Sequence, residues 1–159
     1  MMLDPGCGDT SAEAVAEFVS GLPRPLVFTN GCFDILHRGH VDYLEKAAEY
    51  GRALVVAVND DDSVRLLGKA PDRPINSLAD RMAVLSALRS VDAVVPFSDP
   101  TPLALINAIQ PDVLVKGGDW PVDQIVGAAE VQALGGAVHS IPFRYQRSTT
   151  DQVRKIQGA

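Results

Sequence analysis

Two histidines, His37 and His40, flank Gly39 just ahead of a segment with helical apolar spacing. Their i, i+3 spacing places both imidazoles on one face of a helix's first turn. Unpaired N–H groups and the positive end of the helix dipole gather at the same turn, so an anion is the expected occupant. Gly39 has no Cβ and lets a ligand or a strand approach the backbone. We interpret this turn as a phosphate cradle, with capping or packed histidines as the structural alternative.

A metal site built from Cys32, Asp34, His37 and His40 is a second alternative. Cys32 has no C-x-x-C partner, so the usual thiolate pair of a structural zinc is missing. We therefore expect no metal held by these residues. Asp34 is expected either to position the turn or to contact the ligand directly.

The size and charge of the chain restrict its class. Its 159 residues, 47% of them apolar, predict one domain over 1–159, with 1–9 as a loose N-terminal tail. A net charge of −6 argues against a nucleic-acid partner. Cys7 and Cys32 form no disulfide framework, and neither a signal peptide nor a membrane span is recognisable, so we expect a cytoplasmic protein.

Strands and helices alternate along the whole chain. Apolar runs predict strands at residues 26–29, 53–58, 91–97, 112–116 and 137–141. Helices are predicted at about 10–21, 41–48, 77–88, 102–109 and 122–134, with a last one beginning near 148. The run at 53–58 is apolar at every position, which is typical of a strand buried on both faces of a parallel sheet. This order predicts an α/β fold, a doubly wound sheet of about five parallel strands.

Candidate ligand contacts follow the strands, because ligands bind at the carboxyl edge of such sheets. Asn59 ends the second strand, whereas Asp60 to Asp62 are expected to cap a helix. Lys69 and Arg73 lie in a loop at 67–76, where solvated surface charge is the alternative. Arg81 is expected either to pair with Asp80 on the surface or to contact ligand.

Two further segments carry groups suited to phosphate. Lys116, two glycines, Asp119 and the single tryptophan, Trp120, follow the fourth strand. Three hydroxyl residues at 148–150 head the last helix, although capping requires only one.

The combination of T-N-G-C-F-D before H-x-G-H at 29–40 with S-T-T at 148–150 resembles the HxGH nucleotidyltransferase superfamily. Within it, the chain is most similar to the D-glycero-β-D-manno-heptose 1-phosphate adenylyltransferases. The similarity includes V-A-V-N-D-D at 56–61, R-P-I-N at 73–76, A-D-R-M-A-V-L at 79–85 and V-L-V-K-G-G-D at 113–119. It covers about residues 26–156 and includes no sugar-kinase half.

This resemblance implies a Rossmann-like nucleotidyltransferase fold and transfer of AMP from ATP to the heptose 1-phosphate, for a bacterial surface glycan. ATP would be a substrate carrying Mg²⁺ on its triphosphate, and a homodimer is the expected assembly. The implied catalytic residues are His37, His40 and Lys116. The implied nucleotide-binding residues are Thr29, Asn30, Gly31, Cys32, Phe33, Gly39, Asn59, Lys69, Arg73, Arg81, Gly117, Asp119, Ser148, Thr149 and Thr150.

One segment departs from the family pattern: Tyr145, Gln146 and Arg147 stand where a glycine is usual before S-T-T. The departure concerns the approach to the last helix and its phosphate contacts. Two other functions stay open at this point: a cytidylyltransferase for glycerol 3-phosphate or ethanolamine phosphate, and a nucleotide-binding module without catalysis.

Overall fold

The computed structural model describes residues 1–4, 6, 8–68, 73–145, 148–156 and 158. Within them the strands form one parallel sheet in the order β3-β2-β1-β4-β5. The strands are β1 (Leu26–Gly31), β2 (Ala53–Asn59), β3 (Ala93–Phe97), β4 (Val113–Gly117) and β5 (Ala137–Ile141). The predicted doubly wound α/β sheet is confirmed. Successive strands are added on one side of β1 up to β3 and on the other side from β4, so the topological switch point, where a crevice forms in such sheets, lies between β1 and β4.

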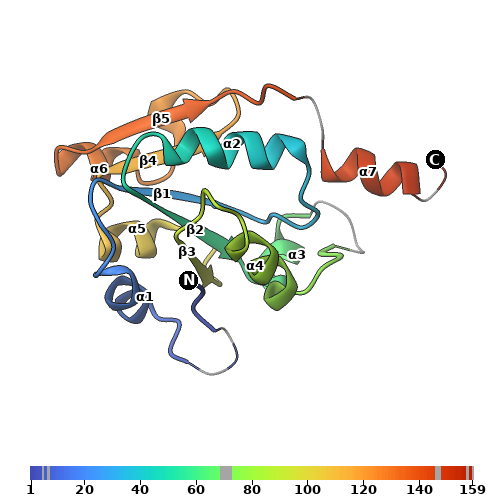
Figure 1. The fold of residues 1–159 in the computed structure, drawn as a ribbon, viewed down its shortest axis with the longest axis horizontal. Coiled ribbons are helices and arrows are strands. Elements are labelled where there is room, and N and C mark those ends of the chain that lie inside the picture. The colour runs from blue at the N-terminus through green and yellow to red at the C-terminus, as the bar shows by residue number, and fades with distance from the viewer. Residues whose placement is uncertain (5, 7, 69–72, 146–147, 157, 159) are drawn as a thin grey trace.

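Helices cover both faces of this sheet (Figure 1). They are α1 (Ala12–Val19), α2 (Arg38–Ala48), α3 (Asp61–Leu66), α4 (Leu78–Ser86), α5 (Leu103–Ile109), α6 (Ala128–Ala133) and α7 (Thr149–Ile156), with a 3₁₀ turn η1 (Val122–Gln124). Among the described residues, no helix has the length and apolar character that crossing a membrane requires. In Figure 1, α7 lies beyond the end of the layered body, and it contributes no buried residue.

All seven residues of β2 are buried, and their side chains point alternately into two core clusters, one on each face of the sheet. Val55 and Ala57 pack in the cluster that includes side chains of α1, α5 and α6, whereas Leu54, Val56 and Val58 pack with α2 and α4. This alternation follows from the two-residue period of a strand. Each fully buried side chain of this size stabilises the fold by roughly 1.5–3 kcal/mol, which anchors the strand whose carboxyl end borders the site.

The predicted helix at 122–134 is wrong as a single element. The chain forms the short turn η1, becomes extended at Ile125, and starts α6 only after Gly127. Gly127 has a φ of 87°, and a Cβ there would come within 2.5 Å of Ile106 Cδ1. A glycine in the left-handed conformation, packed directly on α5, cannot continue a right-handed helix. The helix that the apolar spacing predicted is therefore interrupted at Gly127.

The expected loose tail at 1–9 is attached at its start. The Leu3 N–H donates to Val94 O at 3.0 Å, and the Val94 N–H donates to Met1 O at 2.9 Å. Met2 forms a parallel bridge with Val94. These residues cover the outer edge of β3, which would otherwise present unpaired backbone groups. Cys7 lies outside the described residues.

Candidate active site

A cleft of about 470 Å³ opens at the carboxyl edge of the sheet. It is bordered by the end of β1, the first turn of α2, the end of β4 and the first turn of α7. The two helix N-termini named in the sequence therefore share one cavity. The predicted residues that line it are Asn30, Gly31, Cys32, Phe33, His37, His40, Arg73, Lys116, Gly117, Ser148, Thr149 and Thr150.

The two imidazoles stack at the start of α2. Their centroids lie 3.8 Å apart with planes 19° from parallel, and Phe33 packs edge-on to His40 at 5.4 Å. His37 caps the helix, its Nδ1 accepting the Gly39 N–H at 3.1 Å. Burial lowers the pKa of His37, which favours the neutral ring. With Nδ1 as acceptor, the proton of a neutral ring is on Nε2, which can donate to a phosphate oxygen.

Gly39 is closely packed by its neighbours. A Cβ at this position would lie 3.0 Å from the His37 ring and 3.3 Å from Tyr145 O. The Arg38 guanidinium lies 3.9 Å from the centroid of the Tyr145 ring. The segment that departs from the family pattern therefore begins against α2, while Gln146 and Arg147 lie outside the described residues.

The S-T-T segment is joined to the turn before α2. The Thr149 hydroxyl donates to Ile35 O at 3.2 Å, and Ser148 Oγ accepts the Asp151 N–H at 3.0 Å. Ser148 thus caps α7, and the remaining hydroxyl, on Thr150, lines the cleft.

A second cavity of about 310 Å³ adjoins the first. Asn30, Gly31, Cys32 and Lys116 line both, so the two share the β1–β4 crevice. Lys116 Nζ lies 3.4 Å from Asn30 Oδ1 at this junction. A cation placed between two cavities is suited to phosphate groups that meet there.

Comparison with known proteins identifies the family to which the chain belongs. The cytidylyltransferase-like family model matches residues 28–156. The chain belongs to the cytidylyltransferase-like family. The superfamily resemblance found in the sequence is thereby confirmed.

Two curated relatives of this cytidylyltransferase-like chain differ in length. The chain is 56% identical over 147 residues to D-beta-D-heptose 1-phosphate adenylyltransferase of Bordetella bronchiseptica, covering 92% of this chain and 91% of that protein. It is 51% identical over 156 residues to the bifunctional protein HldE of Haemophilus ducreyi, covering 96% of this chain but 33% of that protein. The chain thus spans about a third of the bifunctional relative.

Solved structures share the fold. The lipopolysaccharide core biosynthesis protein from Thermoplasma volcanium aligns with a TM-score of 0.61 and 29% identity, covering 77% of this chain and 98% of that one. Pantoate-beta-alanine ligase from Francisella tularensis aligns with a TM-score of 0.62 over 94% of this chain and 69% of that one. Its identity of 16% supports the fold alone.

In this cytidylyltransferase-like chain, Asp34 connects the turn after β1 to the 73–76 segment. Its side chain is buried and forms an ion pair with Arg73, while its oxygens accept the N–H groups of Ile75 and Asn76 at 2.9 Å. Burial by itself would raise the pKa of Asp34, but the two N–H donors and the guanidinium outweigh it, so the pKa is lowered. These contacts are those of a residue that positions the 73–76 segment. Lys69, predicted in the same loop, lies outside the described residues.

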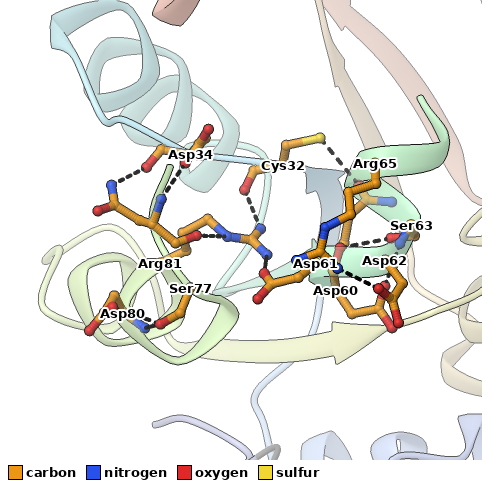
Figure 2. A network of polar contacts seen from close by, with 12 residues as sticks. Cys32, Asp34, Asp60, Asp61, Asp62, Ser63, Arg65, Ser77, Asp80 and Arg81 are labelled. Atoms are coloured by element: carbon orange, nitrogen blue, oxygen red, sulfur yellow. Dashed lines mark hydrogen bonds and ion pairs between the residues drawn. The ribbon is translucent and has the colours of Figure 1, made fainter. Parts of the chain in front are cut away.

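Arg81 does not form the surface pair with Asp80 that was one of its two expected roles (Figure 2). Its side chain is buried and pairs with Asp61 at 2.7 Å, while Nη1 donates to Cys32 O at 2.6 Å and Nε to Asn76 O at 3.1 Å. The surface pair with Asp80 was a wrong expectation, because Asp80 instead accepts the Ser77 hydroxyl at 2.6 Å. Arg81 lines neither cavity and ties the Cys32 turn to α3 and to the 73–76 segment.

The remaining predicted residues lie around the cleft. Thr29 is buried beneath it, 2.5 Å from the Tyr43 hydroxyl, whose pKa is raised by burial. Asn59 lines the second cavity, and its Oδ1 accepts the Cys32 thiol at 3.8 Å. Asp119 is exposed and lines neither cavity. Asp60 caps α3 as predicted, accepting the Ser63 N–H at 2.7 Å.

Sequence reasoning missed several lining residues. Tyr43 and Phe143 border the first cleft, and Phe97, Thr101 and Gln124 border the second cavity. Phe97 ends β3 and Phe143 follows β5, so the rule that ligands bind at the carboxyl edge of the sheet could have found them. Tyr43 lies on the apolar stripe of α2, where its ring is indistinguishable from core.

The described residues contain no group of three or more His, Cys, Asp or Glu side chains able to hold a metal ion. Asp34, the carboxylate that lines the cleft, is engaged by Arg73 and two backbone N–H groups.

Proposed function

We propose that the protein transfers AMP from ATP to D-glycero-β-D-manno-heptose 1-phosphate, releasing pyrophosphate and ADP-heptose. The observation that carries this proposal is the 56% identity, over 92% of the chain, to the Bordetella protein named for that activity. The two adjoining cavities support it, since the reaction needs sites for two phosphorylated substrates. The ADP-heptose would serve a bacterial surface glycan, and we propose the cytoplasm, where ATP is supplied, as the compartment.

The reaction is an in-line displacement at phosphorus. An oxygen of the sugar phosphate forms a bond to the α-phosphorus of MgATP. The bond from that phosphorus to its bridging oxygen breaks, and the electron pair leaves with pyrophosphate. The attacking phosphate is already ionised, so no general base is required. Catalysis therefore depends on positioning and on donors for the charge of the transition state.

Each catalytic group has a defined part in this proposal. His37 and His40 donate from their rings to the phosphates as negative charge develops. The first turn of α7, which lines the same cleft, adds hydroxyl and N–H donors. Lys116 neutralises charge at the junction, where the attacking phosphate meets the triphosphate. Arg73, which is paired with Asp34, lines the same cleft and fixes the position of the 73–76 segment beside it.

Pyrophosphate release tests the proposal directly. The protein is incubated with ATP or CTP, each paired with heptose 1-phosphate, glycerol 3-phosphate or ethanolamine phosphate. Turnover with ATP and heptose 1-phosphate supports the proposal. Turnover only with CTP and an alcohol phosphate identifies the alternative cytidylyltransferase, and binding without turnover identifies a non-catalytic module. Sedimentation of the same sample tests the predicted homodimer.

A further inference from the structure

The indole of Trp120 is fixed in position at the rim of the second cavity. Its ring N–H donates to Gly117 O at 3.1 Å, and its backbone N–H donates to Ser140 Oγ at 3.0 Å. Gly118, at a φ of 113°, makes room for the ring, because a Cβ there would lie 2.9 Å from the indole nitrogen. The side chain is nevertheless 51% exposed. A tryptophan that is held by its polar groups but left open to solvent is not serving the core.

The cavity beside this indole is lined by two aromatic residues, Trp120 and Phe97, by aliphatic side chains and by neutral polar groups. Asn59, which is only 6% exposed, Thr101 and Gln124 supply amide and hydroxyl groups. Lys116 lies at the boundary with the histidine cleft and supplies the positive charge. An apolar ring face matches the C–H face of a sugar, amides and hydroxyls match its hydroxyl groups, and a cation matches its phosphate.

We propose that Trp120 is the platform on which the pyranose ring of the acceptor sugar phosphate packs, and that it determines acceptor affinity. The proposal rests on the proposed function and adds the site and the residue that select the acceptor. Trp120 lines the second cavity and not the cleft that contains the histidines and the S-T-T segment, where we place the triphosphate. Lys116 then lies between the bound sugar phosphate and the α-phosphorus, on the path of attack.

Trp120 is the only tryptophan in the chain, so tryptophan fluorescence reports on this residue alone. The probe is heptose 1-phosphate, added to the full-length protein without nucleotide. We expect a saturable change in emission, and a smaller change with a non-hydrolysable ATP analogue or with inorganic phosphate. A change produced by the ATP analogue but not by the sugar phosphate would overturn the proposal, because the indole would then contact the nucleotide.

Steady-state kinetics provide the second test. In Trp120→Ala we expect the KM for the sugar phosphate to rise about tenfold, corresponding to loss of one aromatic contact. Trp120→Phe, which keeps an aromatic face, should show a smaller rise, and the KM for ATP should change less than twofold in both. Val84→Ala removes a similarly exposed apolar side chain on α4 that lines neither cavity, and is the control.

The outcomes separate this inference from the function on which it rests. If the wild-type protein releases no pyrophosphate with any sugar 1-phosphate, the proposed function fails. If it turns over but Trp120→Ala keeps the wild-type acceptor KM, only the platform is refuted. Should Trp120→Ala not fold, as judged by circular dichroism, Trp120→Phe and the wild-type fluorescence titration decide.

Discussion

The Asp34 carboxylate and the Arg73 guanidinium form an ion pair withdrawn from solvent, their side chains 0% and 5% exposed. The pair joins the turn after β1 to the 73–76 segment, and the Asn76 side chain reinforces it by donating to Asp34 O at 2.6 Å. Burying a charge is costly unless it is paired, so each partner stabilises the fold mainly by satisfying the other.

Replacing Asp34 by Asn should therefore lower the free energy of unfolding by about 3–5 kcal/mol, because Arg73 would stay buried without a counter-charge. Urea denaturation measures this change. Asp62→Asn is the matched control, since Asp62 pairs with Arg65 on the surface, where its side chain is 87% exposed. That variant should lose less than about 1 kcal/mol. Equal losses in the two variants would contradict the positioning role of Asp34.

His40→Ala should lower turnover by about 10²-fold or more, the effect of removing one donor to the transition state. Its circular dichroism spectrum should match that of the wild type, because His40 lies at the rim of the cleft rather than in the core. Glu45→Ala, at an exposed position of the same helix, should keep full activity. A folded His40→Ala variant with near-normal turnover would remove His40 from the mechanism.

Gly39→Ala is expected to reduce turnover about tenfold or more, since the new Cβ would displace the His37 ring or Tyr145 from a contact of 3.0–3.3 Å. Its stability should change little, because Ala favours the helix while the contact opposes it. Gly21→Ala adds a methyl group where nothing lies within 4 Å and serves as the control. Equal turnover in the two variants would show that the ring's position is not critical.

The lowered pKa of His37 makes stability depend on pH. Below its ordinary value of 6.5, the unfolded chain binds a proton at His37 that the folded chain resists, so this residue's contribution to stability falls as the pH falls. His37→Asn keeps a side chain able to cap α2 but does not titrate. Between pH 7.5 and 5, wild type should therefore lose unfolding free energy relative to this variant.

The Asp34 contribution does not interfere with this comparison. Its pKa is lowered from 3.8, so the stability it supplies is present above that pH and is lost only as the pH falls through the folded value. A wild-type-to-variant difference that stays constant from pH 7.5 to 5 would show that His37 titrates alike in the folded and unfolded chains.

The parallel sheet was predictable because its signal is local. The run at 53–58 is apolar at every position, and the structure buries all of β2 on both faces. The two helix N-termini were predictable for the same reason, as histidines and hydroxyl residues mark them in the sequence. Their meeting in one cleft follows from the rule that carboxyl ends of parallel strands share an edge.

Partners far apart in sequence were not predictable. The neighbour Asp80 was the obvious partner of Arg81, but the structure pairs Arg81 with Asp61, on another helix. The break at Gly127 was missed because it depends on contact with Ile106 of α5. The second cavity was missed because its residues come from the ends of β2, β3 and β4 and from η1, and no local pattern marks them as a set.

The hydrogen bond from Thr149 to Ile35 O has a consequence for biosynthesis. During translation the imidazole pair leaves the ribosome more than a hundred residues before the hydroxyl segment that completes the cleft. A nascent chain can therefore form most of its sheet while the cleft proposed for the triphosphate is still incomplete. On the proposed function, ATP can stabilise the protein only after synthesis is nearly finished, and we expect a chain interrupted before residue 148 to be inactive however well its layers had assembled.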